Sequence, residues 1–304
     1  MPATRDIKRR IRSVKNTKKI TRAMELVAAA KMRKAVTKVL ATRSYSDLAW
    51  NTVLHLVKKL NAEHHAFFQE PKKVKKVGII LISTNRGLCG SFNTQLVNKV
   101  LHSIDIHHPE KVETEVITMG LKGGAEARRR NLQIIADFPK DDITASQEKI
   151  GPLANMVVQD FLAKKYDKVF VAYTDFVSAL SQKPHVMQLL PIVPHIDERL
   201  AHIVHEKKEE TNIIAVDNFA DFVFEPDMMH ILNAFLPRLV EIQIYQAVLE
   251  SEASEHSARM FAMRNATEAA SEMIDTLTLA YNQARQAGIT SEIAEIAAGS
   301  AALE

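Results

Sequence analysis

The chain has very little cysteine and no long apolar run, and both absences exclude whole classes of protein. Cys89 is the one cysteine among 304 residues, so neither an internal disulfide nor a zinc cluster built from cysteines can form. The apolar run Val77–Ile82 is far shorter than the roughly 20 residues that a membrane-crossing helix needs. The first residues are charged and lack the apolar core of a signal peptide. We therefore expect a cytosolic protein or one that is peripheral to a membrane.

Glycine and proline are almost absent from the two ends of the chain. Neither occurs between Ala3 and Glu70 or between Arg238 and Ala287, whereas seven of the nine glycines lie between Gly78 and Gly151. Since both residue types interrupt helices, the ends are predicted to be unbroken helices and the middle to alternate between short elements. The chain is accordingly divided into an N-terminal coiled-coil helix (1–70), a central α/β domain (71–227) and a C-terminal coiled-coil helix (228–304).

Acidic residues are scarce at the N-terminus. Residues 1–43 hold fourteen Lys and Arg against only Asp6 and Glu25, whereas residues 241–304 hold ten Asp and Glu against three arginines. A basic segment can be a solvated helix face or can bind nucleic acid, but no interleaved aromatic residues or reading motif accompany this one. A third interpretation is that the two oppositely charged ends face each other or face charged partners.

Apolar residues recur at alternating spacings of four and three at both ends. Eleven of sixteen such positions are apolar in the N-terminal series, and twelve of fifteen in the C-terminal series. A seven-residue repeat marks a left-handed coiled coil, and polar interruptions weaken its seam while fixing its register. The N-terminal seam positions are Ile7, Ile11, Val14, Lys18, Thr21, Glu25, Ala28, Met32, Ala35, Val39, Thr42, Ser46, Ala49, Val53, Leu56 and Leu60. The C-terminal seam positions are Phe235, Leu239, Ile242, Gln246, Leu249, Ala253, His256, Met260, Met263, Thr267, Ala270, Ile274, Leu277, Tyr281 and Ala284.

Helices of this length constrain the architecture. A helix of about fifty residues is about 75 Å long at 1.5 Å per residue, which is too long for its seam to be buried inside one small domain. The two seams bury most simply against each other. If both helices leave the central domain from one side, the pair is antiparallel. The alternative is that two independent amphipathic helices pack on the central domain.

The middle of the chain alternates between strand and helix patterns. This order predicts a Rossmann-like α/β domain with a mostly parallel sheet and helices on its faces. The charged stretch 199–217 is expected to be a loop or linker. Strands are expected at 77–83, 112–119, 132–138, 168–173, 186–193 and 219–224, and helices at 92–104, 122–130 and 150–165.

Few residues suggest chemistry. The turn Ser83–Gly90 follows the first expected strand, where a phosphate-binding loop would lie, but it lacks both the Walker spacing and G-x-G-x-x-G. A tight turn that uses glycine is the alternative interpretation. Cys89 is expected to be a small buried thiol. The histidine pairs at 64–65, 107–108 and 202/205 lack a metal-binding pattern, and no acid/base pair or triad is evident. We therefore expect no catalytic residue, no cofactor and no metal.

Three motifs resemble those of the gamma subunit family of F-type ATP synthases, whose members are central rotor shafts. The stretch from Ile7 to Lys34 is similar to the first helix of that family. Ser83–Asn93 resembles its S-T-D-R-G-L-C-G-x-x-N turn, with Asn85 in place of the usual aspartate. Ile289–Gly299 resembles its C-terminal signature. The last segment, 281–302, is almost free of bulky residues at its tip, which suits a narrow, close-fitting hole.

The resemblance implies a mechanical role. The two helices would form an antiparallel coiled coil inside a ring of three alpha and three beta subunits, and the central domain would be a foot on the epsilon subunit and the membrane ring of c subunits. Proton flow would turn the ring and the shaft and drive ATP synthesis, or the reverse would pump protons. The chain itself would bind neither nucleotide nor nucleic acid. Its expected place is the cytoplasmic face of a bacterial inner membrane, by peripheral association, and a lone Cys89 excludes the plastid-type thiol switch.

The alternative function for the whole chain is a non-enzymatic coiled-coil scaffold or adaptor. A nucleotide-dependent enzyme that uses the Thr84–Gly90 loop is a further alternative.

The resemblance also implies contact residues. Polar contacts with beta-subunit loops are expected from Arg259, Arg264, Arg285, Gln286, Thr290 and Glu292. Contacts with an acidic lever segment of beta are expected from Met24, Lys31, Arg33 and Lys34, and contacts near the c ring from Phe224, Glu225 and Asp227.

Overall fold

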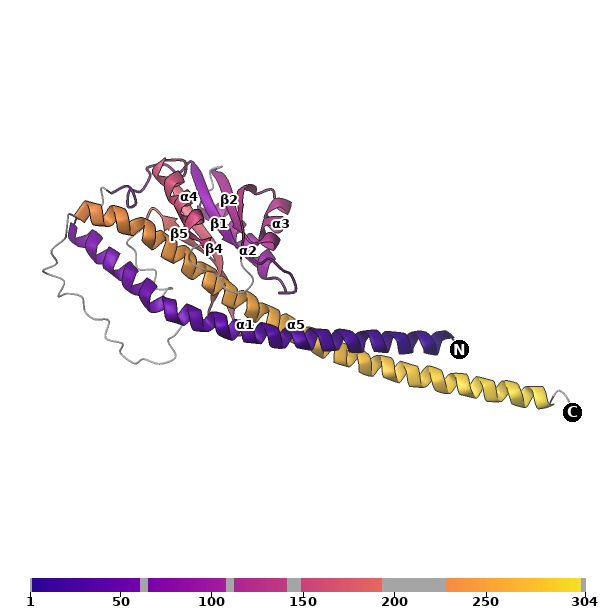
Figure 1. Ribbon diagram of the computed structural model, residues 1–304. Helices are drawn as coiled ribbons and strands as arrows, with labels where there is room; N and C mark the ends of the chain where they lie inside the picture. Colours follow the sequence, from indigo (N-terminus) through magenta and orange to yellow (C-terminus); the bar gives the residue numbers. More distant parts are fainter. Residues whose placement is uncertain (1, 61–64, 108–111, 141–148, 193–227, 302–304) are drawn as a thin grey trace. The chain divides into compact units, whose positions relative to one another are not determined.

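The computed structural model describes residues 2–60, 65–107, 112–140, 149–192 and 228–301 (Figure 1). Its contacts separate two compact units: a helical unit of residues 1–30 and 259–304, and an α/β unit of residues 31–258. Helices α1 (Pro2–Leu60) and α5 (Met228–Ala301) each contribute to both units. The strand expected at 219–224 and the loop expected at 199–217 lie outside the described residues.

In the helical unit, α1 and α5 pair in opposite directions. The Thr21 and Thr267 hydroxyl oxygens lie 2.8 Å apart, and Lys18 Nζ donates to Ser271 Oγ at 3.0 Å. A lower residue number on α1 therefore meets a higher one on α5, which defines an antiparallel pair. Every predicted seam position in this unit is buried or half-buried, whereas most positions between them are exposed. The predicted coiled coil is confirmed.

The same pairing is present in the α/β unit. Thr42 Oγ1 donates to Gln246 Oε1 at 2.8 Å, and Gln243 Nε2 donates to Ser46 Oγ at 3.4 Å. These contacts show that the alternative of two independent amphipathic helices is wrong. The apolar part of the seam in this unit contains Ala35, Val39, Leu249 and Ala253 in one cluster.

The sheet of the α/β unit has the strand order β3-β2-β1-β4-β5. Strands β1 to β4 pair in parallel, and β5 pairs antiparallel with β4. The predicted mostly parallel sheet is confirmed. The strands are β1 (Lys76–Ile82), β2 (Glu113–Met119), β3 (Gln133–Phe138), β4 (Lys168–Phe176) and β5 (Gln182–Leu190).

Strand β5 differs from the prediction, which placed it at 186–193. It begins four residues earlier because a tight hairpin turn returns the chain directly onto β4, where Gln182 pairs with Phe176. Polar residues and Pro184 hid this part of the strand in the sequence. Proline lacks an N–H group, but an edge strand tolerates it, and β5 is the edge of the sheet.

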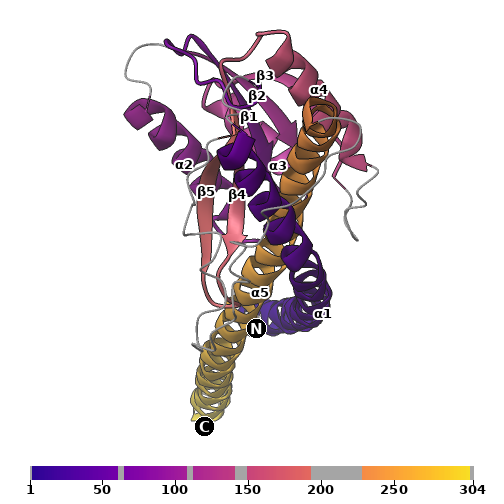
Figure 2. The same ribbon diagram turned by 90° about the vertical axis from the view of Figure 1, so that its left-hand side faces the viewer.

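Helices cover both faces of the sheet (Figure 2). Three helices lie between the strands in the sequence: α2 (Phe92–His107), α3 (Leu121–Arg129) and α4 (Gly151–Leu162). Since successive strand side chains point to opposite faces, Leu81 of β1 packs with α2 and α3, whereas Ile80 and Ile82 pack with α4 and α5. This explains why the apolar run of β1 is unbroken.

A charged cluster lies at the amino ends of β1 and β2. The buried Glu115 carboxylate accepts hydrogen bonds from Lys76 Nζ at 2.6 Å and from the Tyr166 hydroxyl at 2.7 Å. Burial alone raises the pKa of Glu115, but the bonds from Lys76 and Tyr166 outweigh it, so the pKa lies below its ordinary value. Burial and the neighbouring carboxylate raise the pKa of Tyr166. The cluster therefore depends on an ionised Glu115.

Replacing Glu115 by glutamine is expected to lower the free energy of unfolding by about 1 kcal/mol at pH 7, because charged hydrogen bonds to a partly solvated lysine are lost. A carboxyl whose folded-state pKa is lowered stabilises the fold above its unfolded pKa and loses this contribution as the pH falls through the folded one. The difference in urea midpoint between wild type and variant should therefore shrink as the pH falls below about 4.5.

Glu113→Gln is the matched control. The Glu113 side chain is exposed and contacts the same Lys76 Nζ at 3.0 Å, so its replacement should have a small effect. An equal loss for both variants, or a Glu115→Gln effect that stays constant down to pH 3, would contradict the assigned role of Glu115.

Candidate functional site

The usual ligand position of this fold is filled by the chain itself. In doubly wound sheets, ligands bind beyond the carboxyl ends of the strands where the strand order reverses, which here is between β1 and β4. Ser251 Oγ of α5 lies 3.5 Å from the carbonyl oxygen of Ile82, the last residue of β1. Lys140 Nζ donates to the Ser83 carbonyl oxygen at 2.8 Å and to Glu255 Oε2 at 2.7 Å. Helix α5 and Lys140 therefore take the place that a nucleotide would need.

The turn after β1 uses its polar groups internally. Thr84 Oγ1 donates to the Arg86 carbonyl oxygen, and Asn93 both accepts from Thr84 N and donates to Thr84 Oγ1. Gly90 adopts a φ of 62°, in the left-handed region that favours glycine. Cys89 is buried, as predicted. The geometry is that of a tight turn rather than an open phosphate-binding loop.

Asn85 stands where the family motif has aspartate, and the structure gives this residue a specific contact. Its Nδ2 donates to the Lys140 carbonyl oxygen at 2.6 Å. An ionised aspartate is an acceptor only and could not make this bond. This hydrogen bond therefore joins the turn after β1 to the main chain at Lys140, which follows β3.

Two further observations concern metals and membranes. Among the residues described, no group of three or more His, Cys, Asp or Glu is arranged to hold a metal ion. Within the same ranges, no helix combines the length and the apolar character that crossing a membrane requires.

The predicted polar contact residues of α5 lie along the helical unit. Arg259 is half-buried, and the side chains of Arg264, Arg285 and Gln286 are exposed. Arg264 Nε lies 3.2 Å from Glu268 Oε1, one helical turn further along. Thr290 and Glu292 are also exposed, so these side chains remain accessible to a partner.

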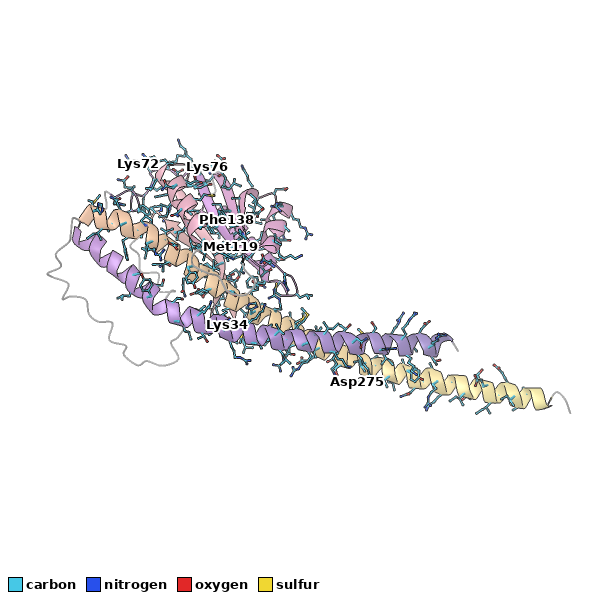
Figure 3. All side chains as sticks on the ribbon, viewed as in Figure 1. Lys34, Lys72, Lys76, Met119, Phe138 and Asp275 are labelled. Atoms are coloured by element: carbon cyan, nitrogen blue, oxygen red, sulfur yellow. The ribbon has the colours of Figure 1, made fainter. Side chains whose placement is uncertain are left out.

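The predicted contact residues of α1 fall in both units. Met24 is half-buried in the helical unit. Lys31 is half-buried in the α/β unit, and Arg33 and Lys34 are exposed there; Figure 3 labels Lys34 on α1. The predicted residues near the c ring, which are Phe224, Glu225 and Asp227, lie outside the described residues.

The two helices of the helical unit carry net charges of opposite sign. Its part of α1 is strongly basic and its part of α5 is mainly acidic, and Figure 3 labels one of these acids, Asp275, on α5. Ion pairs such as Arg9 with Asp6 and Arg22 with Glu25 join residues of one helix. Charge complementarity therefore favours pairing of the helices through the overall field rather than through these particular bonds.

An exposed apolar stripe at the tip of α5 escaped the sequence analysis. Ile289, Ile293 and Ile296 are 43%, 62% and 74% exposed, and spacings of four and three place them on one helix face. The stripe lies just before the small residues at 297–302 on which the expectation of a slender tip rests. The same spacing rule would have found the stripe, but the stripe is shifted by one position from the seam. Ala284 and Gly288 are the last half-buried residues of α5 that the structure describes.

These features define a class of protein in which both terminal helices pair into a long antiparallel coiled coil and the middle of the chain forms an α/β domain. A family model described as ATP synthase matches residues 3–303. The ATP synthase gamma chain of Roseiflexus castenholzii is 42% identical, covering 100% of this chain and 99% of the relative. That of Chloroflexus aurantiacus is 39% identical, with the same coverage. The chain belongs to the ATP synthase gamma chain family, whose members are non-catalytic stalk subunits.

Solved structures share the fold. The rotor of the mitochondrial ATP synthase from Euglena gracilis matches with a TM-score of 0.63 at 20% identity, covering 95% of this chain and 99% of that one. The central stalk and c-ring structure from Tetrahymena thermophila contains a match with a TM-score of 0.60 at 23% identity, covering 81% and 99%.

A polar layer interrupts the seam of the helical unit. The Thr21 and Thr267 hydroxyls bond to each other, and they also lie within hydrogen-bond distance of the Lys18 and Met263 carbonyl oxygens of their own helices. Polar seam residues fix the register of a coiled coil at a cost in stability. We assign this role to the threonine pair.

The double variant Thr21→Val/Thr267→Val is expected to be at least as stable as wild type, whereas either single variant should lose up to about 1 kcal/mol, because it leaves one hydroxyl without its cross-helix partner. Thermal unfolding of all four proteins, followed by circular dichroism, gives the coupling energy. Thr17→Val is the control, since its exposed hydroxyl bonds only to the Ser13 carbonyl oxygen. A double variant less stable than both singles would contradict the assignment.

Proposed function

We propose that this chain is the central shaft of a proton-translocating ATP synthase and carries rotation between the membrane ring of c subunits and a ring of three alpha and three beta subunits. In this role it drives ATP synthesis, or proton pumping in reverse. The observation that carries the proposal is the relation to gamma chains along the whole length of the chain. The filled crevice at β1 supports a role without a bound nucleotide.

The physical mechanism is differential contact. A rod changes the affinity of a surrounding site only if it interacts differently with the states of that site. The helical unit presents unlike surfaces around its axis, because α1 is basic and α5 is acidic with an apolar stripe near its end. Rotation of such a surface presents a different contact to each beta subunit in turn.

We assign the individual contacts as follows. The isoleucine stripe at 289–296 lies against an apolar surface of the alpha and beta ring, since this chain leaves it uncovered. Exposed ion pairs are each worth under about 1 kcal/mol, so the charged contacts act as a set. The beta-subunit contacts are Met24, Lys31, Arg33, Lys34, Arg259, Arg264, Arg285, Gln286, Thr290 and Glu292. The contacts on the c-ring side are Phe224, Glu225 and Asp227.

The proposal includes a location and a division of labour. The chain acts at the cytoplasmic face of a bacterial inner membrane, attached peripherally through the complex. Residues 1–70 and 228–304 form the shaft, and residues 71–227 form the foot on the epsilon subunit and the c ring. A free-standing adaptor would not require full-length similarity to gamma chains, which is why the shaft is preferred.

Isolation of the native complex through a tag on this chain tests the proposal. We expect alpha and beta subunits to co-purify in equal numbers, three of each per tagged chain, together with epsilon and c subunits. Recovery of the tagged chain alone, or as a homodimer, would contradict the shaft and favour the adaptor. A tag on the α/β unit, such as at the exposed Leu180 turn, leaves both helix ends unmodified.

Truncation after Ala287 is expected to weaken assembly and to lower proton pumping several-fold, while the α/β unit stays folded, because the truncation removes the uncovered tip but no residue of that unit. Vesicle acidification and circular dichroism measure the two effects. A full-length variant with serine at 289, 293 and 296 separates apolar contact from length. Wild-type pumping and ATP synthesis by the truncated complex would contradict the role of the tip.

A further inference from the structure

The first turns of α5 are held to the sheet by apolar contact. Leu232, Leu236, Leu239, Val240 and Ile244 belong to the core cluster that also contains β1 and β4. Apolar burial is roughly proportional to area and has no preferred direction. Apolar contact keeps the helix on the sheet. It does not fix the rotation of the helix about its axis as closely as hydrogen bonds do, because hydrogen bonds require particular atoms to meet.

Further along α5 the contact changes character. Ser251, Ser254 and Ser257 are fully buried, and these small side chains allow the helix to approach the carboxyl edge of the sheet closely. Ser257 Oγ donates to the Ala179 carbonyl oxygen in the β4–β5 turn and accepts from Gln182 Nε2. In this stretch Ser251 and Ser257 therefore add directed bonds to main-chain oxygens, those of Ile82 and Ala179.

Lys140 is the charged member of this attachment. Its side chain is 3% exposed and that of Glu255 is 9% exposed. One ammonium group joins three parts of the fold, since it donates to the end of β1 and to α5 while its own residue follows β3. Burying such a pair has a large desolvation cost, and apolar residues of similar volume often stabilise a fold as well or better. Stability alone is therefore a poor explanation for this pair.

We propose that Lys140 is a positioning residue that transmits torque between the α/β domain and α5. The proposal rests on the proposed function. Side chains lie off the axis of a helix that is about 10–12 Å across, so rotation of α5 relative to the sheet carries the Glu255 carboxylate along an arc away from the Lys140 ammonium group. The bond thus opposes the motion that would let the foot turn without the shaft.

The test uses the complete complex, reconstituted in vesicles with this chain as its gamma chain. Lys140→Gln removes the charge, and Lys140→Gln/Glu255→Gln removes both charges and so avoids leaving one ion buried without its partner. Lys72→Gln is the control, since Lys72 is an exposed lysine before β1, away from the α5 attachment (Figure 3). Proton pumping and ATP hydrolysis are measured on the same vesicles.

In both glutamine variants we expect the protons pumped per ATP hydrolysed to fall several-fold while hydrolysis continues. Lys140→Arg, which keeps the charge, should restore most of the ratio, and Lys72→Gln should match wild type. An unchanged ratio in either assembled glutamine variant would overturn the proposal. Failure of both to assemble would also overturn it, because the pair would then serve folding. If unmodified complex does not pump, the proposed function itself is contradicted, whatever the variants do.

Discussion

The architecture depends on the burial of one helical seam against the other. Neither terminal helix could hide its apolar stripe alone, because helices of 59 and 74 residues extend far beyond what a small domain can cover. Antiparallel pairing solves this for both at once. The polar layers at Thr21 with Thr267 and at Thr42 with Gln246 then select one register among the many that small apolar residues would allow.

The α/β unit is a nucleotide-binding type of fold put to another use. Its sheet order creates a crevice at the carboxyl ends of β1 and β4, and α5 fills that crevice with serines and with Glu255. A position that holds a ligand in other doubly wound proteins is occupied here by a helix. The same helix supplies part of the core of this unit and also contributes to the helical unit.

Periodicity in the sequence predicted the long-range pairing well, because every seam position whose side chain is described is buried or half-buried. Local strand patterns predicted four strands closely. The early start of β5 was hidden by Pro184, whose tolerance depends on the strand being at an edge, which is a property of the whole sheet. Lys140 carried no signal, because Ser83 and Glu255 are far from it in sequence and only the folded chain brings them together. The isoleucine stripe was visible but was passed over because the spacing series ended at Ala284.

Antiparallel pairing of the two ends has a consequence for biosynthesis. Thr21 meets a partner, Thr267, that a ribosome adds 246 residues later, which at ordinary elongation rates of about 5–20 residues per second is a delay of roughly 12–50 s. During this interval the seam of the nascent α1 has no partner helix to cover it. The seam contains lysine, threonine, glutamate and serine, and these polar residues reduce its attraction for other unfinished chains while the rest of the polypeptide is being made.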